Sequence, residues 1–222
     1  MTTFSKLSLQ PPLVAALSQI GYVEMTEIQE ASLPLILEGH DVVGQAQTGS
    51  GKTAAFGLGV LQRLKAHQPG PQALILCPTR ELADQVASEI RRLASQLPNT
   101  RVLVLCGGRP FYHQQKHLKH GVSVVVGTPG RLLKHLDKET LDLSSIRTLV
   151  LDEADRMLDM GFSDDVLRII KHTPKTRQTL LFSATWPEGT QKLSSAVQKN
   201  PKKVSVTSVV SENKLRQRVY FC

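Results

Sequence analysis

The stretch AQTGSGKT, residues 46–53, decides the fold, because it almost matches the phosphate-binding loop pattern G-x-x-x-x-G-K-[ST]. Ala46 stands where that pattern has glycine. In such a loop, glycines let consecutive backbone N–H groups point at an oxyanion, and the following helix adds its positive end. Gly49 and Gly51 supply that freedom, and alanine suffices at position 46 if its φ is negative. The alternative is a Gly-rich turn between a strand and a helix.

The loop predicts a site for a nucleoside triphosphate and Mg²⁺. We expect Lys52 to reach the β and γ phosphates and the hydroxyl of Thr53 to hold Mg²⁺. The predicted nucleotide contacts in the loop are Ala46, Gln47, Thr48, Gly49, Ser50, Gly51, Lys52 and Thr53.

A triphosphate with Mg²⁺ also needs a carboxylate at the end of a neighbouring strand. The run TLVLDE, residues 148–153, supplies Asp152 and Glu153 after a buried-looking strand. We expect Asp152 to hold Mg²⁺ directly or through water, and Glu153 to orient and deprotonate the attacking water. The alternative for this acidic pair is an ordinary helix N-terminus.

Short β-branched runs alternate with amphipathic stretches along the chain. Seven runs are almost continuously apolar, as expected of strands that are covered on both faces in a parallel sheet. They are residues 41–45, 73–77, 101–106, 123–127, 148–153, 179–185 and 203–210. Apolar residues at helical spacing from Leu82 to Leu97 predict a crossover helix. The pattern therefore predicts an α/β fold with helices on both faces of a mainly parallel sheet.

The composition is that of a basic chain with one substantial core. The 222 residues carry 27 Lys and Arg against 19 Asp and Glu, a net charge of +8, which points to a polyanionic partner. Cys77, Cys106 and Cys222 have no metal-like spacing, so a reducing, cytoplasmic setting fits. No apolar run approaches the length of a membrane span, and we expect no membrane partner.

The phrase Asp152-Glu153-Ala154-Asp155 carries a family resemblance. The chain resembles the DEAD-box family of ATP-dependent RNA helicases, whose other signatures follow in family order and cover essentially the whole chain. They are PTREL at 78–82, the pair Gly107-Gly108, TPGR at 128–131 and SAT at 183–185. The family's phosphate loop also commonly begins with alanine. The resemblance implies a RecA-like three-layer sandwich with about seven strands.

Upstream, GYVEMTEIQ, residues 21–29, resembles the family's adenine-reading element, and Phe4 stands at the matching aromatic position. The resemblance implies that Gln29 bonds the adenine edge, that Tyr22 stacks on the ring and that Thr26 braces the phosphate loop. A glutamine amide suits adenine because it donates and accepts side by side. Thr26 and Gln29 also fit an ordinary capping box, and this alternative stays open.

The resemblance also implies an RNA groove and a coupling element. The implied RNA contacts are Pro78, Thr79, Arg80, Gly107, Gly108, Thr128, Pro129 and Arg131. Arginines, hydroxyls and glycine N–H groups without an aromatic ladder predict backbone binding that is largely independent of base sequence. The alternative for the two arginines is that each only begins a helix near the surface. Ser183 and Thr185 resemble the coupling element and are expected to be tied to Asp155.

These features predict the N-terminal ATP- and RNA-binding domain of an ATP-dependent RNA helicase, which locally unwinds RNA duplexes or remodels RNA–protein complexes. We expect a monomeric RecA-like domain over residues 1–207, with the adenine-reading element in 1–38, and the start of an interdomain linker over 208–222. The family's second RecA-like domain and its arginine finger have no counterpart in this sequence. The 222-residue piece is therefore expected to be weakly active.

Two other functions stay open. One is a nucleotide-gated RNA clamp or annealing module in which turnover matters little, although the presence of Lys52, Asp152 and Glu153 argues against it. The other is a DNA translocase. The stretches GSGKTAAFGLG and SATWPEGTQ look most like bacterial family members linked to ribosome assembly.

Overall fold

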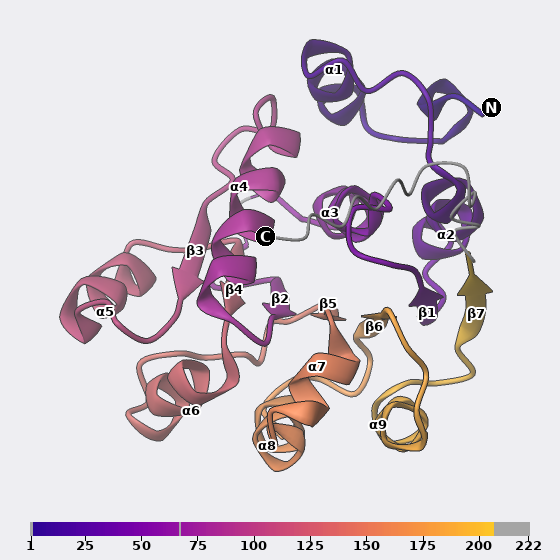
Figure 1. Ribbon diagram of the computed structural model, residues 1–222. Helices are drawn as coiled ribbons and strands as arrows, with labels where there is room; N and C mark the ends of the chain where they lie inside the picture. Colours follow the sequence, from indigo (N-terminus) through magenta and orange to yellow (C-terminus); the bar gives the residue numbers. More distant parts are fainter. Residues whose placement is uncertain (1, 67, 207–222) are drawn as a thin grey trace, which may run out of the picture.

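The computed structural model of the chain describes residues 2–66 and 68–206 (Figure 1). Its centre is a seven-stranded sheet in the order β3-β4-β2-β5-β6-β1-β7, and every neighbouring pair is parallel. The strands are β1 (Val42–Gln45), β2 (Ala73–Leu76), β3 (Val102–Leu105), β4 (Val124–Gly127), β5 (Thr148–Leu151), β6 (Gln178–Ser183) and β7 (Lys202–Ser205). All seven predicted strands are present, but the edge strand β7 is mostly exposed and is not covered on both faces as expected. Residues 207–210 of the seventh predicted run lie outside the described residues. The predicted linker, residues 208–222, lies outside the described residues.

Helices cover both faces of the sheet, so the predicted three-layer sandwich is confirmed. One face carries α1 (Pro11–Gln19), α2 (Glu27–Leu37), α3 (Lys52–Gln62) and α4 (Arg80–Leu93), and the short 3-10 helix η1 (Phe4–Lys6) precedes them. The other face carries α6 (Pro129–Asp137), α7 (Ala154–Asp159), α8 (Ser163–Lys171) and α9 (Glu188–Val197). Helix α5 (Phe111–Lys119) lies beside the edge strand β3. Within the described residues, no helix is long and apolar enough to cross a membrane.

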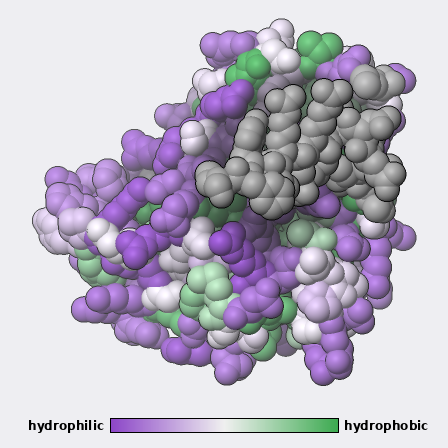
Figure 2. All heavy atoms as spheres, in the orientation of Figure 1, coloured by the Kyte–Doolittle hydropathy of each residue, from purple (hydrophilic) through white to green (hydrophobic). Residues whose placement is uncertain are grey.

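The apolar residues divide into two cores because successive residues of a strand point to opposite faces. Ile75 of β2 packs in the core under α1–α4, whereas its neighbours Leu74 and Leu76 pack in the core under α6–α9. Cys77 and Cys106 are buried in the first core. Hydrophilic residues cover most of the face seen in Figure 2, where hydrophobic residues form only small separate areas.

The strand order decides which loops meet. Strand β6 lies between β5 and β1, and all three run in the same direction, so their carboxyl ends share one edge of the sheet. This edge brings together the phosphate loop after β1, Asp152 after β5 and Ser183 at the end of β6. The loops after β2, β3 and β4 meet at the other half of the same edge.

At the opposite, amino edge, Asp41 ties three strands together. Its Oδ1 accepts a hydrogen bond from the N–H of Thr179 in β6, and its Oδ2 accepts one from the N–H of Lys199, each over 2.7 Å. Its backbone oxygen accepts a third bond from the N–H of Lys202 in β7 over 2.8 Å. The side chain and backbone of this one residue therefore connect the amino ends of β1, β6 and β7.

Replacing Asp41 with alanine should lower the free energy of unfolding by about 2–3 kcal/mol, because the buried N–H of Thr179 then has no acceptor. Urea unfolding followed by circular dichroism measures the change. The exposed Asp159 at the end of α7 provides the control, since Asp159→Ala should change the free energy by less than about 0.5 kcal/mol. Equal effects of the two substitutions would show that Asp41 does not fasten the strands.

Candidate functional site

Residues 46–53 form the turn between β1 and α3. Ala46 is buried and its φ is not positive, and its N–H donates to the oxygen of Ser183 over 3.0 Å, which extends the pairing of β1 with β6. Gly49 and Gly51 have φ values of 84° and 93°, in the region that favours glycine. Alanine is thus compatible with the first position of the loop, whereas glycine is required at these two.

Gln29 joins the start of α2 to the phosphate loop. Its Oε1 accepts the N–H of Thr26 over 2.9 Å, and its Nε2 donates to the backbone oxygen of Gly51 over 3.0 Å. A Cβ atom at Gly51 would lie 2.6 Å from Gln29 Nε2 and 2.9 Å from Thr26 Oγ1, so both side chains pack closely against the loop at Gly51. The capping contact and the loop contact therefore coexist. One N–H and one lone pair of the Gln29 amide remain for another partner.

The two aromatic residues of the predicted adenine element lie together. The rings of Phe4 and Tyr22 are stacked, with centroids 6.3 Å apart and planes inclined by 18°. Phe4 is buried, whereas Tyr22 is half-buried and donates its hydroxyl to Glu89 of α4 over 2.8 Å. Stacking of Tyr22 on an adenine ring stays a prediction.

The side chains of Lys52 and Asp152 meet in one buried place. Lys52 Nζ lies 3.6 Å from Asp152 Oδ1, and the two residues are 4% and 0% exposed. Burial raises the pKa of Asp152 to about 6, against the opposing effect of Lys52 and with a further increase from Glu153. The first residue of α3 and the residue after β5 thus share one crevice, as the sequence predicts.

Three buried polar atoms at this place lack a hydrogen-bond partner within the described part of the chain: Ser50 Oγ, Lys52 Nζ and Asp152 Oδ2. An unsatisfied buried polar group costs about 1–3 kcal/mol, so such groups are normally paired. An ammonium and a hydroxyl suit phosphate oxygens, and a carboxylate suits a divalent cation. Thr53 is half-buried in the first turn of α3 beside them. These residues fit a triphosphate with Mg²⁺.

Glu153 occupies a strained junction between β5 and α7. Its φ of 51° and ψ of 53° are left-handed, a conformation that is uncommon for non-glycine residues. The hydroxyl of Thr48 donates to Glu153 Oε1 over 3.2 Å, and Arg156 Nη1 lies 3.4 Å from Oε2. The carboxylate is therefore held against the phosphate loop. The sequence analysis missed Arg156, although its spacing of three residues from Glu153 on a helix is a usable signal.

Asp155 links the loop after β5 to the loop after β6. Its Oδ2 accepts the N–H and the hydroxyl of Thr185 over 2.8 and 2.7 Å, and its own N–H donates to Ser183 Oγ over 3.2 Å. Burial alone would raise the pKa of Asp155, but the hydrogen bonds of Thr185 and Ser183 outweigh it and lower the pKa. The predicted tie between these three residues is present.

A second cavity, of about 570 Å³, lies at the other half of the carboxyl edge. Six of the eight predicted RNA contacts line it, namely Pro78, Thr79, Arg80, Gly107, Thr128 and Arg131. Pro129, the first residue of α6, is buried, and Gly108 has a φ of 76° in a place where a Cβ would overlap the guanidinium of Arg80. Met160 and Phe162 also line the cavity and were not predicted.

Gln114 and His135 form a buried support behind this cavity. Gln114 Oε1 accepts a hydrogen bond from Arg131 Nη1 over 2.8 Å and lies 3.0 Å from His135 Nε2. Gln114 Nε2 donates to the oxygen of Cys106 over 3.0 Å. This network fixes Arg131 through two residues that the sequence analysis missed. The sequence feature that could have revealed this network is His135, a histidine on the apolar face of α6 between Leu132 and Leu136.

Comparison with known proteins gives the family of this sequence. The family model described as DEAD/DEAH box helicase matches residues 26–193. The chain is 55% identical to the ATP-dependent RNA helicase DbpA of Escherichia coli strain K12 over 221 residues, which are 99% of this chain and 48% of that protein. It is 46% identical to the ATP-dependent RNA helicase CshA of Limosilactobacillus reuteri, over 98% of this chain and 45% of that protein.

A solved structure agrees with the fold. A DEAD box protein from the hyperthermophile Methanococcus jannaschii matches with a TM-score of 0.88 and 38% identity, over 93% of this chain and 56% of that chain. The chain spans about half the length of these relatives.

The buried His135 should make the fold sensitive to acid. Its pKa is lowered from 6.5 to about 4, first by burial and then by the charges of Arg131 and Lys134. Between these values only the unfolded chain takes up the proton, so the stability that the neutral ring confers falls as the pH drops. From pH 7.5 to pH 5, this histidine should account for a loss of about 2 kcal/mol.

Urea unfolding of the chain and of His135→Asn at both pH values isolates this effect, because the other titrating groups are common to the two proteins. The native chain should lose more stability than the variant. Parallel pH profiles would contradict the prediction.

Proposed function

Because the chain belongs to the DEAD/DEAH box helicase family, we propose that it is the N-terminal ATP- and RNA-binding domain of an ATP-dependent RNA helicase. The proposed activity is local unwinding of RNA duplexes or remodelling of RNA–protein complexes. One observation carries the proposal: the buried Lys52–Asp152 pair keeps unsatisfied polar atoms beside the phosphate loop and Glu153. The names of the relatives, which are ATP-dependent RNA helicases, support the reaction class.

In this proposal the residues of the chain bind and orient ATP with Mg²⁺. Lys52 binds phosphate oxygens, Thr53 and Asp152 hold Mg²⁺, and Gln29 offers its remaining donor and lone pair to adenine. Mg²⁺, when bound, neutralises negative charge on the phosphates. Glu153 orients a water molecule and accepts its proton, and its position against the phosphate loop suits that role.

Two connections could carry information between the nucleotide site and the RNA groove. The segment 152–162 begins with Asp152 and Glu153 in the nucleotide site and ends with Met160 and Phe162, which line the RNA groove. The bonds between Asp155 and Thr185 tie this segment to the end of β6. A shift of Glu153 would therefore be transmitted to both places, which supports the proposed coupling role of Asp155, Ser183 and Thr185.

The proposal includes a second RecA-like domain that completes both sites in the full-length protein. An arginine finger from that domain would contribute ~10³ to 10⁵ in rate, so the 222-residue chain alone should bind nucleotide weakly and hydrolyse it slowly. We further propose a monomer that acts in the cytoplasm. A role in ribosome assembly stays a prediction, which rests on the resemblance of the stretches GSGKTAAFGLG and SATWPEGTQ to those of bacterial family members.

In the full-length protein, replacing Glu153 with glutamine should slow single-turnover phosphate release by about 100-fold or more in the presence of RNA, because the amide cannot accept the proton. The affinity for RNA in the presence of ATP should persist. Asp159→Asn, which removes an exposed carboxylate from the same helix, is the control and should keep the native rate.

Unchanged phosphate release in Glu153→Gln, with retained ATP-dependent RNA binding, would instead identify the chain as a nucleotide-gated clamp. Tighter binding to single-stranded DNA than to RNA in the same assay would favour a DNA translocase.

Replacing Gln114 with alanine should weaken binding of single-stranded RNA about fivefold, because Arg131 loses a hydrogen-bond partner of its guanidinium. The dependence of affinity on salt should become shallower by about one phosphate contact, an effect that a general loss of packing would not produce. Fluorescence anisotropy with a labelled RNA ten-mer measures both. Gln115→Ala, at the next position of α5, should leave them unchanged, and an unaltered salt slope in Gln114→Ala would contradict the prediction.

A further inference from the structure

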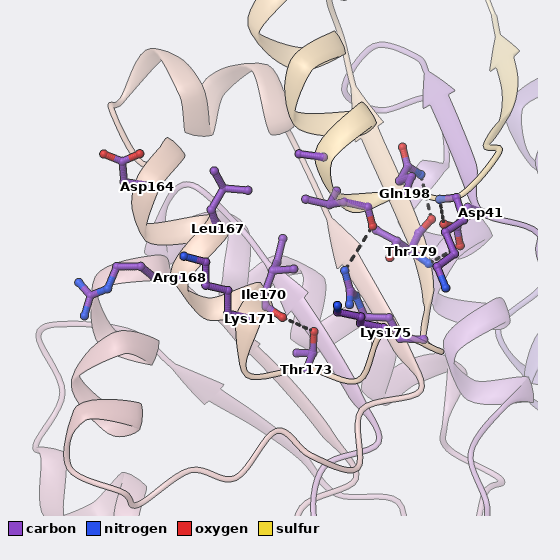
Figure 3. A pocket seen from close by; sticks show the side chains of 14 residues that line it. Asp41, Asp164, Leu167, Arg168, Ile170, Lys171, Thr173, Lys175, Thr179 and Gln198 are labelled. Carbon is purple, nitrogen blue, oxygen red and sulfur yellow. Dashed lines mark hydrogen bonds between the residues drawn. The ribbon is translucent and has the colours of Figure 1, made fainter.

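A cavity of about 630 Å³ lies at the amino edge of the sheet, away from both sites (Figure 3). Its walls come from α8, the loop before β6 and the end of α9. Asp41 and Thr179 in its lining stand at the starts of β1 and β6, whereas the phosphate loop and Ser183 stand at the ends of those strands. A four-residue strand spans roughly 13 Å, so the depth of the sheet separates the cavity from the nucleotide site.

The lining of this cavity combines an apolar part with a surplus of positive charge. Leu167, Ile170, Ala196 and Val197 form the apolar part. The five cationic lining residues are Arg168, Lys171, Lys175, Arg177 and Lys199, and the acidic ones are Asp41 and Asp164. In Figure 3, Leu167 and Ile170 of α8 lie on one side of the cavity, and Asp41, Thr179 and Gln198 lie on the other. The side chains of Asp164 and Arg168 extend outward from α8.

Most of this positive charge has no partner in the described residues. Arg168 lies 3.4 Å from Asp137, but none of the described carboxylates forms an ion pair with Lys171, Lys175 or Lys199. The carboxylate of Asp41 is occupied by two backbone N–H groups. The cavity therefore presents at least three free ammonium groups beside an apolar surface.

Arg177 adds a fixed charge to the wall. Its Nη1 and Nη2 donate to the backbone oxygens of Pro174 and Val197 over 2.9 and 3.2 Å. Its Nε is buried and has no hydrogen-bond partner in the described part of the chain. Two carbonyl groups hold this guanidinium in place, and the nearby carboxylate of Asp41 balances part of its charge.

A neighbouring cavity of about 440 Å³ continues the same surface. The two share Asp41, Lys175, Arg177 and Lys199, and the second adds His40 and Lys202. We call the pair the basal groove. It is apolar and basic at the end beside α8 and almost wholly polar and basic at the end beside Lys202.

We propose that the basal groove binds an acidic peptide segment of a partner protein, with one apolar side chain in the first cavity and carboxylates along the lysines. Charge complementarity selects an anion, and the apolar lining selects a ligand that has an apolar anchor as well. Nucleic acid is the competing anion, because lysines also bind phosphates, but the apolar part of the first cavity favours a ligand that carries an apolar side chain. Such a partner could bind together with ATP and RNA, since those sites lie at the opposite edge.

Ten-residue fluorescent peptides test this proposal with the 222-residue chain. The first carries four carboxylates around a central leucine, the second has serine in place of that leucine, and the third has lysines in place of the carboxylates. The first peptide should bind at least about tenfold more tightly than the other two.

Two double variants locate the binding. Lys171→Glu with Lys175→Glu should weaken binding of the first peptide at least about tenfold. Lys116→Glu with Lys192→Glu changes the net charge equally at two exposed positions outside the groove and should keep the affinity within about twofold. All four lysines are exposed, and thermal unfolding verifies that both variants fold.

Three results would overturn the proposal. The first is equal binding of the three peptides, or no binding of any. The second is an equal loss of affinity in the two double variants, which would mean attraction by net charge alone. The third is displacement of the peptide by single-stranded RNA with equal loss of RNA affinity in the Lys171/Lys175 variant, which would identify an RNA site.

Discussion

The buried pair of Lys52 and Asp152 is the constraint on which the rest of the functional edge depends. Two charges in an apolar interior are costly unless they are paired and hydrogen-bonded, and this pair leaves an ammonium and a carboxylate oxygen unsatisfied. The order of the parallel strands β1, β6 and β5 places both groups at one edge of the sheet, with Glu153 beside them. A site that is unsatisfied in the protein alone is prepared for a charged ligand.

The same edge holds two sites that share parts. Strands β5, β6 and β1 end at the proposed nucleotide site, and β3, β4 and β2 end at the proposed RNA groove, so the groove lies alongside the crevice. The segment from Asp152 to Phe162 contributes to both, and the bonds between Asp155 and Thr185 fix it to the loop after β6. Behind the groove, Gln114 and His135 hold Arg131 through buried hydrogen bonds. Short connections of this kind let a change at one site alter the other.

At the amino edge of the sheet, the buried carboxylate has hydrogen-bond partners within the protein, unlike Asp152 Oδ2 at the carboxyl edge. There Asp41 satisfies backbone N–H groups of two neighbouring segments, so its carboxylate serves the fold. The lysines around it have no such structural role in the described residues, and they leave a basic groove with an apolar lining. Because the proposed nucleotide and RNA sites lie at the carboxyl edge, contacts at the amino edge would not compete with those ligands.

The sequence by itself determined the seven strands, the phosphate loop and the acidic pair, because buried parallel strands are nearly continuous apolar runs and the loop needs glycine at fixed positions. Motifs of the family also indicated most of the residues that line the proposed RNA groove. The sequence did not reveal Gln114, His135 or the basal groove. Their roles depend on which helices the strand order places side by side, and a single polar residue carries no signal of a partner 17 or more positions away. Only the tertiary structure decided those contacts, since hydrogen bonds and cavities between distant segments form after the strand order is set.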